Sequence, residues 1–148
     1  MSRLMRGCLF LALMLGGCTS TAHFDISVTN RLSEPVTVWL TKLHGPYGDG
    51  WEPPEQLALE TQGQVRVGGV VVPPGESRGA VIAGNFESGN YAVLRVYRAV
   101  KIETILAIDQ GNPDRFDYPL PSGTSNLDIV MDNGQLSLVP HVSTRPSN

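Results

Sequence analysis

The sequence has few cysteines and no long apolar run, and each of these two shortages excludes a class of protein. Its two cysteines, Cys8 and Cys18, are too few for a disulfide scaffold or a cysteine-rich metal site. The main apolar run, residues 8–15, is shorter than the roughly 20 residues of a membrane-spanning helix. The 148 residues suffice for one domain, and 16 Gly with 11 Pro indicate many turns.

The first seventeen residues follow the order of an export signal. Arg3 and Arg6 precede the apolar run 8–15, so a positively charged region is followed by a hydrophobic one. The run ends at Leu15-Gly16-Gly17-Cys18, which resembles the lipobox of bacterial lipoproteins. The resemblance implies cleavage before Cys18, a diacylglycerol on its thiol and usually an N-acyl chain such as palmitate. A plain secretory signal with an incidental cysteine is the alternative.

The resemblance to lipoproteins also implies a location. Two or more acyl chains on Cys18 give stable attachment to a bilayer. In this family Thr19, rather than Asp, after the cysteine indicates the outer membrane of a double-membraned bacterium, with the domain facing the periplasm. Removal of Arg3 and Arg6 leaves nine basic and 14 acidic residues, a net charge of −5. Nucleic acid is therefore not an expected partner.

Alternation of apolar and polar residues is the recurring signal from residue 24 onward. The segments 24–30, 36–43 and 91–98 have the period of two that is typical of half-buried strands. Asn133-Gly134 predicts a type I′ hairpin turn that places Met131 opposite Leu136.

Three further segments complete the expected elements. Residues 102–108 predict a strand paired with 92–96. Residues 65–72 predict a strand interrupted at Gly68-Gly69 and ended by the turn at 73–75. The pair Pro53-Pro54 predicts one helical turn that includes Leu57 and Leu59.

These patterns predict an all-β fold, a single antiparallel β-sandwich of about eight strands. The segment VTNRLSEPVTVWL is similar to the first two strands of immunoglobulin-like and fibronectin-like bacterial domains, although the cysteines and tryptophan of true immunoglobulin cores are missing. We expect four regions: a cleaved signal peptide at 1–17, the lipidated cysteine and a short tether at 18–23, the sandwich at 24–140 and a flexible tail at 141–148.

Patterns that suggest chemistry are weak in this sequence. Residues 75–79 match G-x-S-x-G, but the nucleophile elbow of hydrolases needs a strand-to-helix turn, and strand-like residues follow here. The segment DQGNPDRFD offers oxygen ligands without the spacing of a calcium loop. His23, His44 and His141 stand singly. We therefore expect no catalytic residue, metal or cofactor, while Asp49 and Glu52 leave a hydrolytic carboxylate pair open.

Aromatic side chains supply the candidate binding residues. Tyr47 and Trp51 lie in the long loop 44–55, where flat apolar faces suit sugars, peptides or a partner protein. The alternative for Trp51 is a lid over one end of the core. Four residues of the predicted strands form either an exposed patch or a second buried side: Trp39, Tyr91, Arg95 and Tyr97.

The sequence thus predicts a membrane-anchored exported lipoprotein that acts as a non-catalytic binding or envelope assembly module. Its expected partners are the lipid bilayer, through acylated Cys18, and an envelope protein or glycan. The alternatives are a cell-envelope hydrolase and a protease inhibitor that presents the loop 44–55, although that loop has no Lys or Arg for a trypsin-like target.

Overall fold

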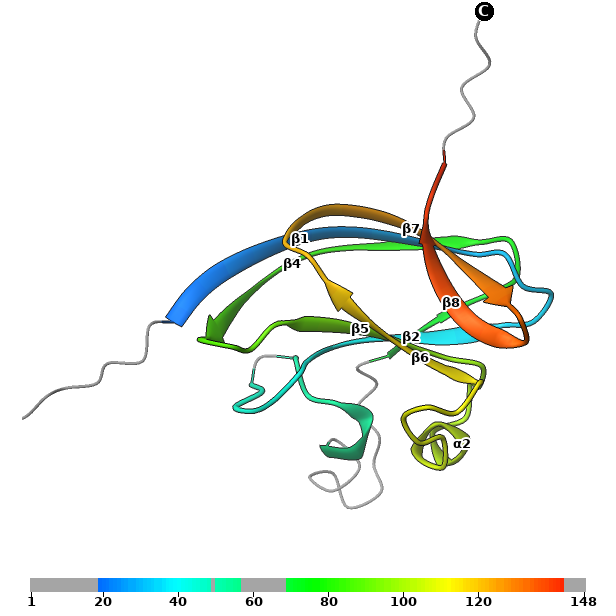
Figure 1. Cartoon of the computed structure of the whole chain (residues 1–148), viewed down its shortest axis with the longest axis horizontal. Coiled ribbons are helices and arrows are strands. Elements are labelled where there is room, and N and C mark those ends of the chain that lie inside the picture. The colour runs from blue at the N-terminus through cyan, green and yellow to red at the C-terminus, as the bar shows by residue number, and fades with distance from the viewer. Residues whose placement is uncertain (1–18, 49, 57–68, 143–148) are drawn as a thin grey trace, which may run out of the picture.

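Two four-stranded sheets pack face to face in the computed structural model, which describes residues 19–48, 50–56 and 69–142 (Figure 1). The first sheet has the order β4-β1-β7-β8 and the second the order β3-β2-β5-β6. The strands of the first sheet are β4 (Ser77–Glu87), β1 (Thr19–Asn30), β7 (Gly123–Asp132) and β8 (Gln135–Pro140). Those of the second are β3 (Gly69–Val72), β2 (Val36–Lys42), β5 (Ala92–Tyr97) and β6 (Arg115–Leu120).

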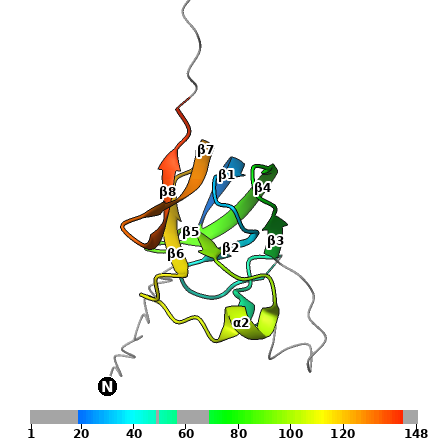
Figure 2. The same cartoon turned by 90° about the vertical axis from the view of Figure 1, so that its right-hand side faces the viewer.

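The predicted β-sandwich of eight strands is confirmed. Figure 2 shows the two layers end on, with β4 above β3 on one side and β8 above β6 on the other. One pairing differs from the prediction, because β1 and β7 run parallel whereas the other neighbours are antiparallel. Between β1 and β7 the chain crosses to the second sheet and back twice, first through β2 and β3 and then through β5 and β6.

The core between the sheets follows the predicted alternation. Phe24, Ile26 and Val28 of β1 face inward, and every second residue of β2 and β5 meets them from the other sheet. The hairpin at Asn133-Gly134 is also confirmed, because both residues have positive φ and Met131 pairs with Leu136. Burial of these inner rows removes apolar surface from water, which is the main favourable contribution to folding.

The first strand begins at Thr19, which differs from the tether expected at 18–23. Residues 19–23 pair in register with residues 83–87 of β4, so they extend the sheet beyond the point where the core alternation starts. Sequence periodicity misses this part because its side chains are mostly exposed, while the backbone hydrogen bonds of a ladder need no apolar residues. Cys18 and the signal segment lie outside the described residues.

The strand expected at 102–108 was wrong, because this segment contains the helix α2 (Ile102–Leu106). Strand β5 pairs instead with β6, a strand that was not expected. Ile102 and Ile105 lie three positions apart on one face of this helix, and Ile108 follows just after its end. That face packs against the outer side of the second sheet, which supplies the burial that the helix needs.

Connections determine what covers each end and face of the sandwich. The loop after β2 ends in a helical turn at 54–56, whereas Leu57, Leu59 and Gly68 lie outside the described residues. The start of β1 lies at one end, and α2 and the β7-β8 hairpin lie at the other (Figure 1). Among the described residues, no helix has the length and apolarity needed to cross a membrane.

Candidate functional site

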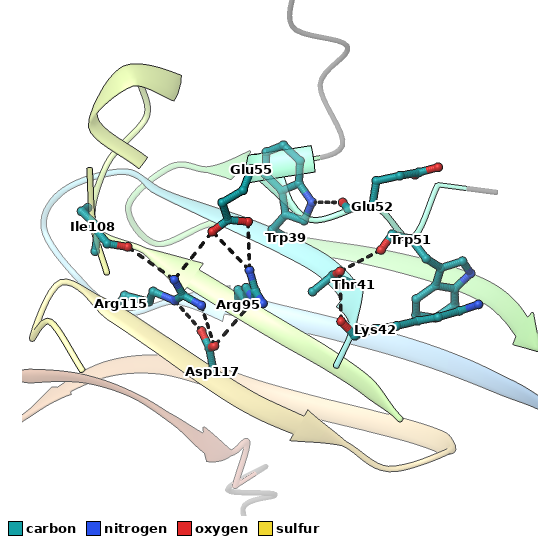
Figure 3. Close-up of polar contacts among 10 residues, drawn as sticks. All are labelled: Trp39, Thr41, Lys42, Trp51, Glu52, Glu55, Arg95, Ile108, Arg115 and Asp117. Carbon is teal, nitrogen blue, oxygen red and sulfur yellow. Dashed lines mark hydrogen bonds and ion pairs between the residues drawn. The ribbon is translucent and has the colours of Figure 1, made fainter. Parts of the chain in front are cut away.

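The two middle strands of the second sheet, β2 and β5, are buried on both faces, and their outer face holds several of the predicted site residues. Trp39 and Tyr97 project from β2 and β5 away from the core, where Ile105 and Ile108 cover them. The indole Nε1 of Trp39 donates a hydrogen bond to the backbone oxygen of Glu52 at 2.8 Å (Figure 3). The sequence left open whether this face is an exposed patch or a second buried side. Trp39 and Tyr97 are buried, which agrees with the second alternative.

Four charged side chains, Arg95, Arg115, Glu55 and Asp117, form what we call the arginine cluster beside these aromatics (Figure 3). The guanidinium of Arg115 donates to both carboxylate oxygens of Asp117 at 2.8 Å. Glu55 reaches Nη1 of Arg95 at 3.3 Å and Nη1 of Arg115 at 3.8 Å. The cluster therefore connects β5 and β6 to the helical turn at 54–56.

Burial and charge set the electrostatics of the arginine cluster. The pKa of Arg115 is raised mainly by its hydrogen bonds to Asp117, an effect that burial opposes. The pKa of the Tyr97 hydroxyl is raised by burial, against the effect of the nearby Arg115 and Arg95 charges. The Arg115 guanidinium carbon lies 5.6 Å from the centre of the Tyr97 ring, within the range of a cation-π contact. Two cations face two carboxylates, so the cluster is balanced without a bound anion.

Two polar atoms of this region have no hydrogen-bond partner within the described residues: Nε of Arg95 and the hydroxyl of Tyr97. Oδ2 of Asp117 lies 3.6 Å from Nε of Arg95, which is within ion-pair range and too long for a hydrogen bond. The arrangement contains no nucleophile next to a general base. Its chemistry is that of a structural ion network that holds a loop on a sheet.

Trp51 lies inside the sandwich, which corresponds to the core-lid alternative. Its side chain is 1% exposed and contacts Phe86 and Phe24 edge to face, with ring centres 5.2 and 5.8 Å apart. The hydroxyl of Thr41 donates to the backbone oxygen of Trp51 at 2.7 Å (Figure 3). Lys42 fixes the start of the same loop, because Nζ donates to the backbone oxygen of Tyr47 at 3.1 Å.

The candidate binding residues do not gather on one surface. Tyr47 is half-buried in the loop, and Tyr91 is 41% exposed just before β5. The backbone oxygen of Tyr91 accepts a hydrogen bond from the backbone N–H of Leu43, which places both tyrosines near the end of the sandwich where β1 begins. Binding through Tyr47 and Tyr91 stays a prediction.

The serine of the G-x-S-x-G pattern and the C-terminal histidine have ordinary partners. Ser77 begins β4, and its hydroxyl shares a hydrogen bond of 2.7 Å with Thr29, so no strand-to-helix elbow forms. His141 Nδ1 lies 3.1 Å from the carboxylate of Asp128, which Arg31 Nε also approaches to 3.2 Å. Burial raises the pKa of Asp128, but hydrogen bonds from His141 and Arg31 outweigh it, and the net pKa lies below its ordinary value.

Three oxygen-bearing side chains of segment 109–117 have partners within the protein. The side chain of Asn112 accepts a hydrogen bond from the backbone of Asp114, and Asp114 forms an ion pair with Arg98. Asp117 belongs to the arginine cluster. Within residues 19–48, 50–56 and 69–142, no group of three or more His, Cys, Asp or Glu side chains is placed to hold a metal ion.

Sequence reasoning missed Glu55 and Asp117 as partners of Arg95, and it missed Arg115 as the second arginine of the cluster. The signal was present, since Arg115 and Asp117 are two residues apart and project from one face of a strand. Segment 115–120 contains a proline and two charged residues, and no strand was predicted there. The pairing of β6 with β5 is what places Asp117 directly opposite Arg95.

The fold and this face together define an all-β sandwich with a loop fastened to it by an ion network. No family model matches the sequence, and no curated protein matches it either. Among solved structures, the chain is similar to the T6SS lipoprotein TssJ1 from Pseudomonas aeruginosa, with a TM-score of 0.39 and 17% sequence identity over 84% of this chain and 99% of that one. A likeness this distant does not establish a shared function.

Proposed function

We propose that this chain is a lipid-anchored protein of the bacterial cell envelope that acts by non-catalytic binding. The observation that carries the proposal is the ordered signal in front of the sandwich: basic residues, an apolar run and Leu15-Gly16-Gly17-Cys18. The domain that follows is a sandwich whose paired side chains fit a binding or assembly module. The outer membrane, facing the periplasm, is the proposed location because Thr19 follows the cysteine.

The start of β1 determines how such an anchor would present the domain. Because β1 begins at Thr19, an acyl group on Cys18 would have no spacer between the bilayer and the first sheet. The end of the sandwich that carries Thr19 would therefore face the membrane. The opposite end, with α2 and the Asn133-Gly134 hairpin, would face away from it (Figure 1). Partners would reach the domain from that end or from its sides.

The arginine and serine side chains that could take part in catalysis are paired within the protein, which supports binding over catalysis. The guanidinium groups of Arg95 and Arg115 are paired with Glu55 and Asp117, and the Ser77 hydroxyl is bonded to Thr29. A protease inhibitor that presents the loop 44–55 is not favoured, because Trp51 in this loop points into the core. The proposed role is to hold or assemble another envelope component at the bilayer surface.

The proposal is tested by changing the sulfur that would carry the lipid. Cys18→Ser should abolish lipidation and move the protein from the membrane fraction to the soluble fraction, with mass spectrometry showing loss of the acylated N-terminal peptide. Cys8→Ser is the matched control, since Cys8 lies in the cleaved segment and its loss should leave lipidation intact. An unmodified thiol at Cys18 in protein from the native host would refute the proposal.

A further inference from the structure

Among the residues that the structure describes, strand β4 forms the longest free edge of the sandwich, and this edge lacks the usual protection against pairing. The edge strands are β3, β4, β6 and β8. Three of them are blunted, because β3 has four described residues, β6 contains Pro119 with two charged side chains, and β8 is six residues ending in Pro140. Strand β4 has 11 residues, and the stretch 79–86 contains neither a charge nor a proline. Natural edges commonly carry such groups to prevent strand addition.

The direction of the backbone groups of β4 follows from two hydrogen bonds of β1. The N–H of Asn30 donates toward the β4 side, to the oxygen of Glu76, and the N–H of Arg31 donates toward β7, to the oxygen of Ile129. Even-numbered residues of β1 therefore bond toward β4. Since even-numbered residues of the two strands lie opposite one another, the odd-numbered residues of β4 direct their N–H and C=O groups to the free edge. Residues 79, 81, 83 and 85 form this unpaired row.

An apolar groove lies beside the same edge, between β3 and β4. Its volume is about 240 Å³, and its lining includes Val70, a β3 side chain that is 49% exposed. Val81, on the outer face of β4, is 84% exposed. Besides Val70, seven apolar side chains line the groove, together with the charged Arg78: Ile26, Val28, Val38, Leu40, Ala80, Ile82 and Leu94. A strand added to β4 would place every second side chain on the groove side of the sheet, where apolar residues would remove this surface from water.

We propose that the free edge of β4 binds an extended segment of another protein, which adds to the first sheet as a fifth strand. The segment is about nine residues long and uncharged in its middle, with apolar residues at the positions that face the groove. It carries a Lys or Arg at one end, because Glu87 is exposed at the end of β4 and lies in the same outward row as residues 81 and 83. Opposite charges directly across a strand pair are favourable.

A second copy of this chain fits the edge less well, an argument that depends on the proposed lipid anchor. Two β4 strands can pair symmetrically only when they run antiparallel about a twofold axis perpendicular to the sheet. The two Thr19 residues would then lie at opposite ends of the paired strands, although both Cys18 anchors must reach one bilayer without a spacer. A strand from a different protein has no such constraint.

The test uses the protein purified in detergent and the synthetic peptide KVTVTVTVT, whose lysine would face Glu87 and whose valines would face the groove in an antiparallel pairing. Binding is measured by isothermal titration, and amide hydrogen exchange gives the decisive readout. We expect the amides of residues 79, 81, 83 and 85 to be protected by the peptide, while the even-numbered amides of β4, already bonded to β1, change little. Apolar adhesion to the groove would not produce this alternation.

Variants at one exposed position complete the design. Val81→Pro removes an outward N–H, and Val81→Lys adds a charge to the edge; each should weaken peptide binding about tenfold or more. Val81→Thr, which keeps the N–H and the β-branched shape, should bind as the parent does. Glu87→Lys should weaken binding, and a peptide with glutamate in place of lysine should restore it.

The proposal is overturned by unaltered binding to Val81→Pro and Val81→Lys, or by uniform protection without alternation. It is also overturned by a dimer in light scattering that Val81→Lys dissolves, since the occupant would then be a second copy. The peptide experiment does not depend on lipidation. An unmodified Cys18 would therefore refute the proposed anchor and leave the peptide result standing.

Discussion

The indole of Trp51 lies directly against Gly84 of β4, where a Cβ atom would come within 2.6 Å of Cζ2 of the ring. The absence of a side chain at Gly84 is what lets the loop after β2 turn back and insert its tryptophan between the two sheets. The same ring contacts Phe86 of β4 and Phe24 of β1, so Trp51 joins the loop to both strands of this pair.

Removing the Trp51 side chain should destabilise the fold strongly. Trp51→Ala should lower the free energy of unfolding by about 3–5 kcal/mol, because it leaves a cavity lined by Phe24 and Phe86. Urea denaturation followed by circular dichroism measures the loss. Val81→Ala, at an exposed position of the neighbouring strand, is the control and should change it by less than about 0.5 kcal/mol. A similarly small loss for Trp51→Ala would argue against its burial.

Filling position 84 should destabilise the protein through the same contact. Gly84→Ala should cost about 1–3 kcal/mol of unfolding free energy, since the new methyl group meets a ring held by its neighbours. In a Trp51→Ala background the cost should fall markedly, because the cavity accommodates the methyl group. A double-mutant cycle measures this coupling, and additive effects would contradict the contact.

The two carboxylates of the arginine cluster should contribute unequally. The Asp117 side chain is 20% exposed and pairs with two guanidinium groups, so Asp117→Asn should cost up to about 3 kcal/mol by leaving charge uncompensated near the protein interior. Glu55 is 49% exposed, and Glu55→Gln should cost less than about 1 kcal/mol because water screens its ion pairs. Chemical denaturation of both variants tests the order, and equal losses would be inconsistent with these positions.

The Tyr97 hydroxyl should be dispensable for stability. It is buried and has no hydrogen-bond partner within the described residues, so folding removes its contact with water without replacing it. Tyr97→Phe should therefore leave the free energy of unfolding unchanged or raise it by up to about 1 kcal/mol. A thermal scan with Tyr91→Phe as an exposed control measures the effect. A loss greater than about 1 kcal/mol would show that the hydroxyl has a bonding partner.

The pKa of Asp128 predicts a stability change in acid. Because this pKa is below its ordinary value of about 3.9, the unfolded chain takes up the proton first as the pH falls. The stabilising contribution of Asp128 is thus complete above the ordinary pKa and is lost as the pH falls through the lower pKa of the folded state. Asp128→Asn should flatten the dependence of unfolding free energy on pH below about 4. An unchanged acid dependence, measured by urea unfolding at several pH values, would contradict the shift.

Local patterns in the sequence were enough to predict the β-sandwich and the register of its last hairpin. The alternation in β1, β2 and β5 predicted their inward rows, and Asn133-Gly134 predicted the last hairpin, because positive φ at two adjacent positions is a local requirement. The segment at 102–108 was misread because Ile102 and Ile108 satisfy both a strand period and a helical one. The predicted partner of this segment, β5, pairs with β6 instead, so no place beside β5 is left for a strand at 102–108.

The candidate site depended on contacts that sequence spacing does not contain. Trp39, Trp51 and Tyr97 have the composition of a binding patch, but loop closure onto Gly84 and coverage by α2 buried all three. Arg95 was singled out from the sequence, whereas its partners Glu55 and Asp117 come from segments 40 residues before it and 22 residues after it.

The sequence by itself determined the all-β class, the inward rows of three strands and the last turn, because these follow from side-chain alternation and from backbone angles that neighbouring residues set. Only the tertiary structure decided which aromatic side chains are buried, which charges pair and which strand edge stays free. Those features depend on segments distant in the chain, and their energies come from burial and pairing that exist only once the two sheets have closed.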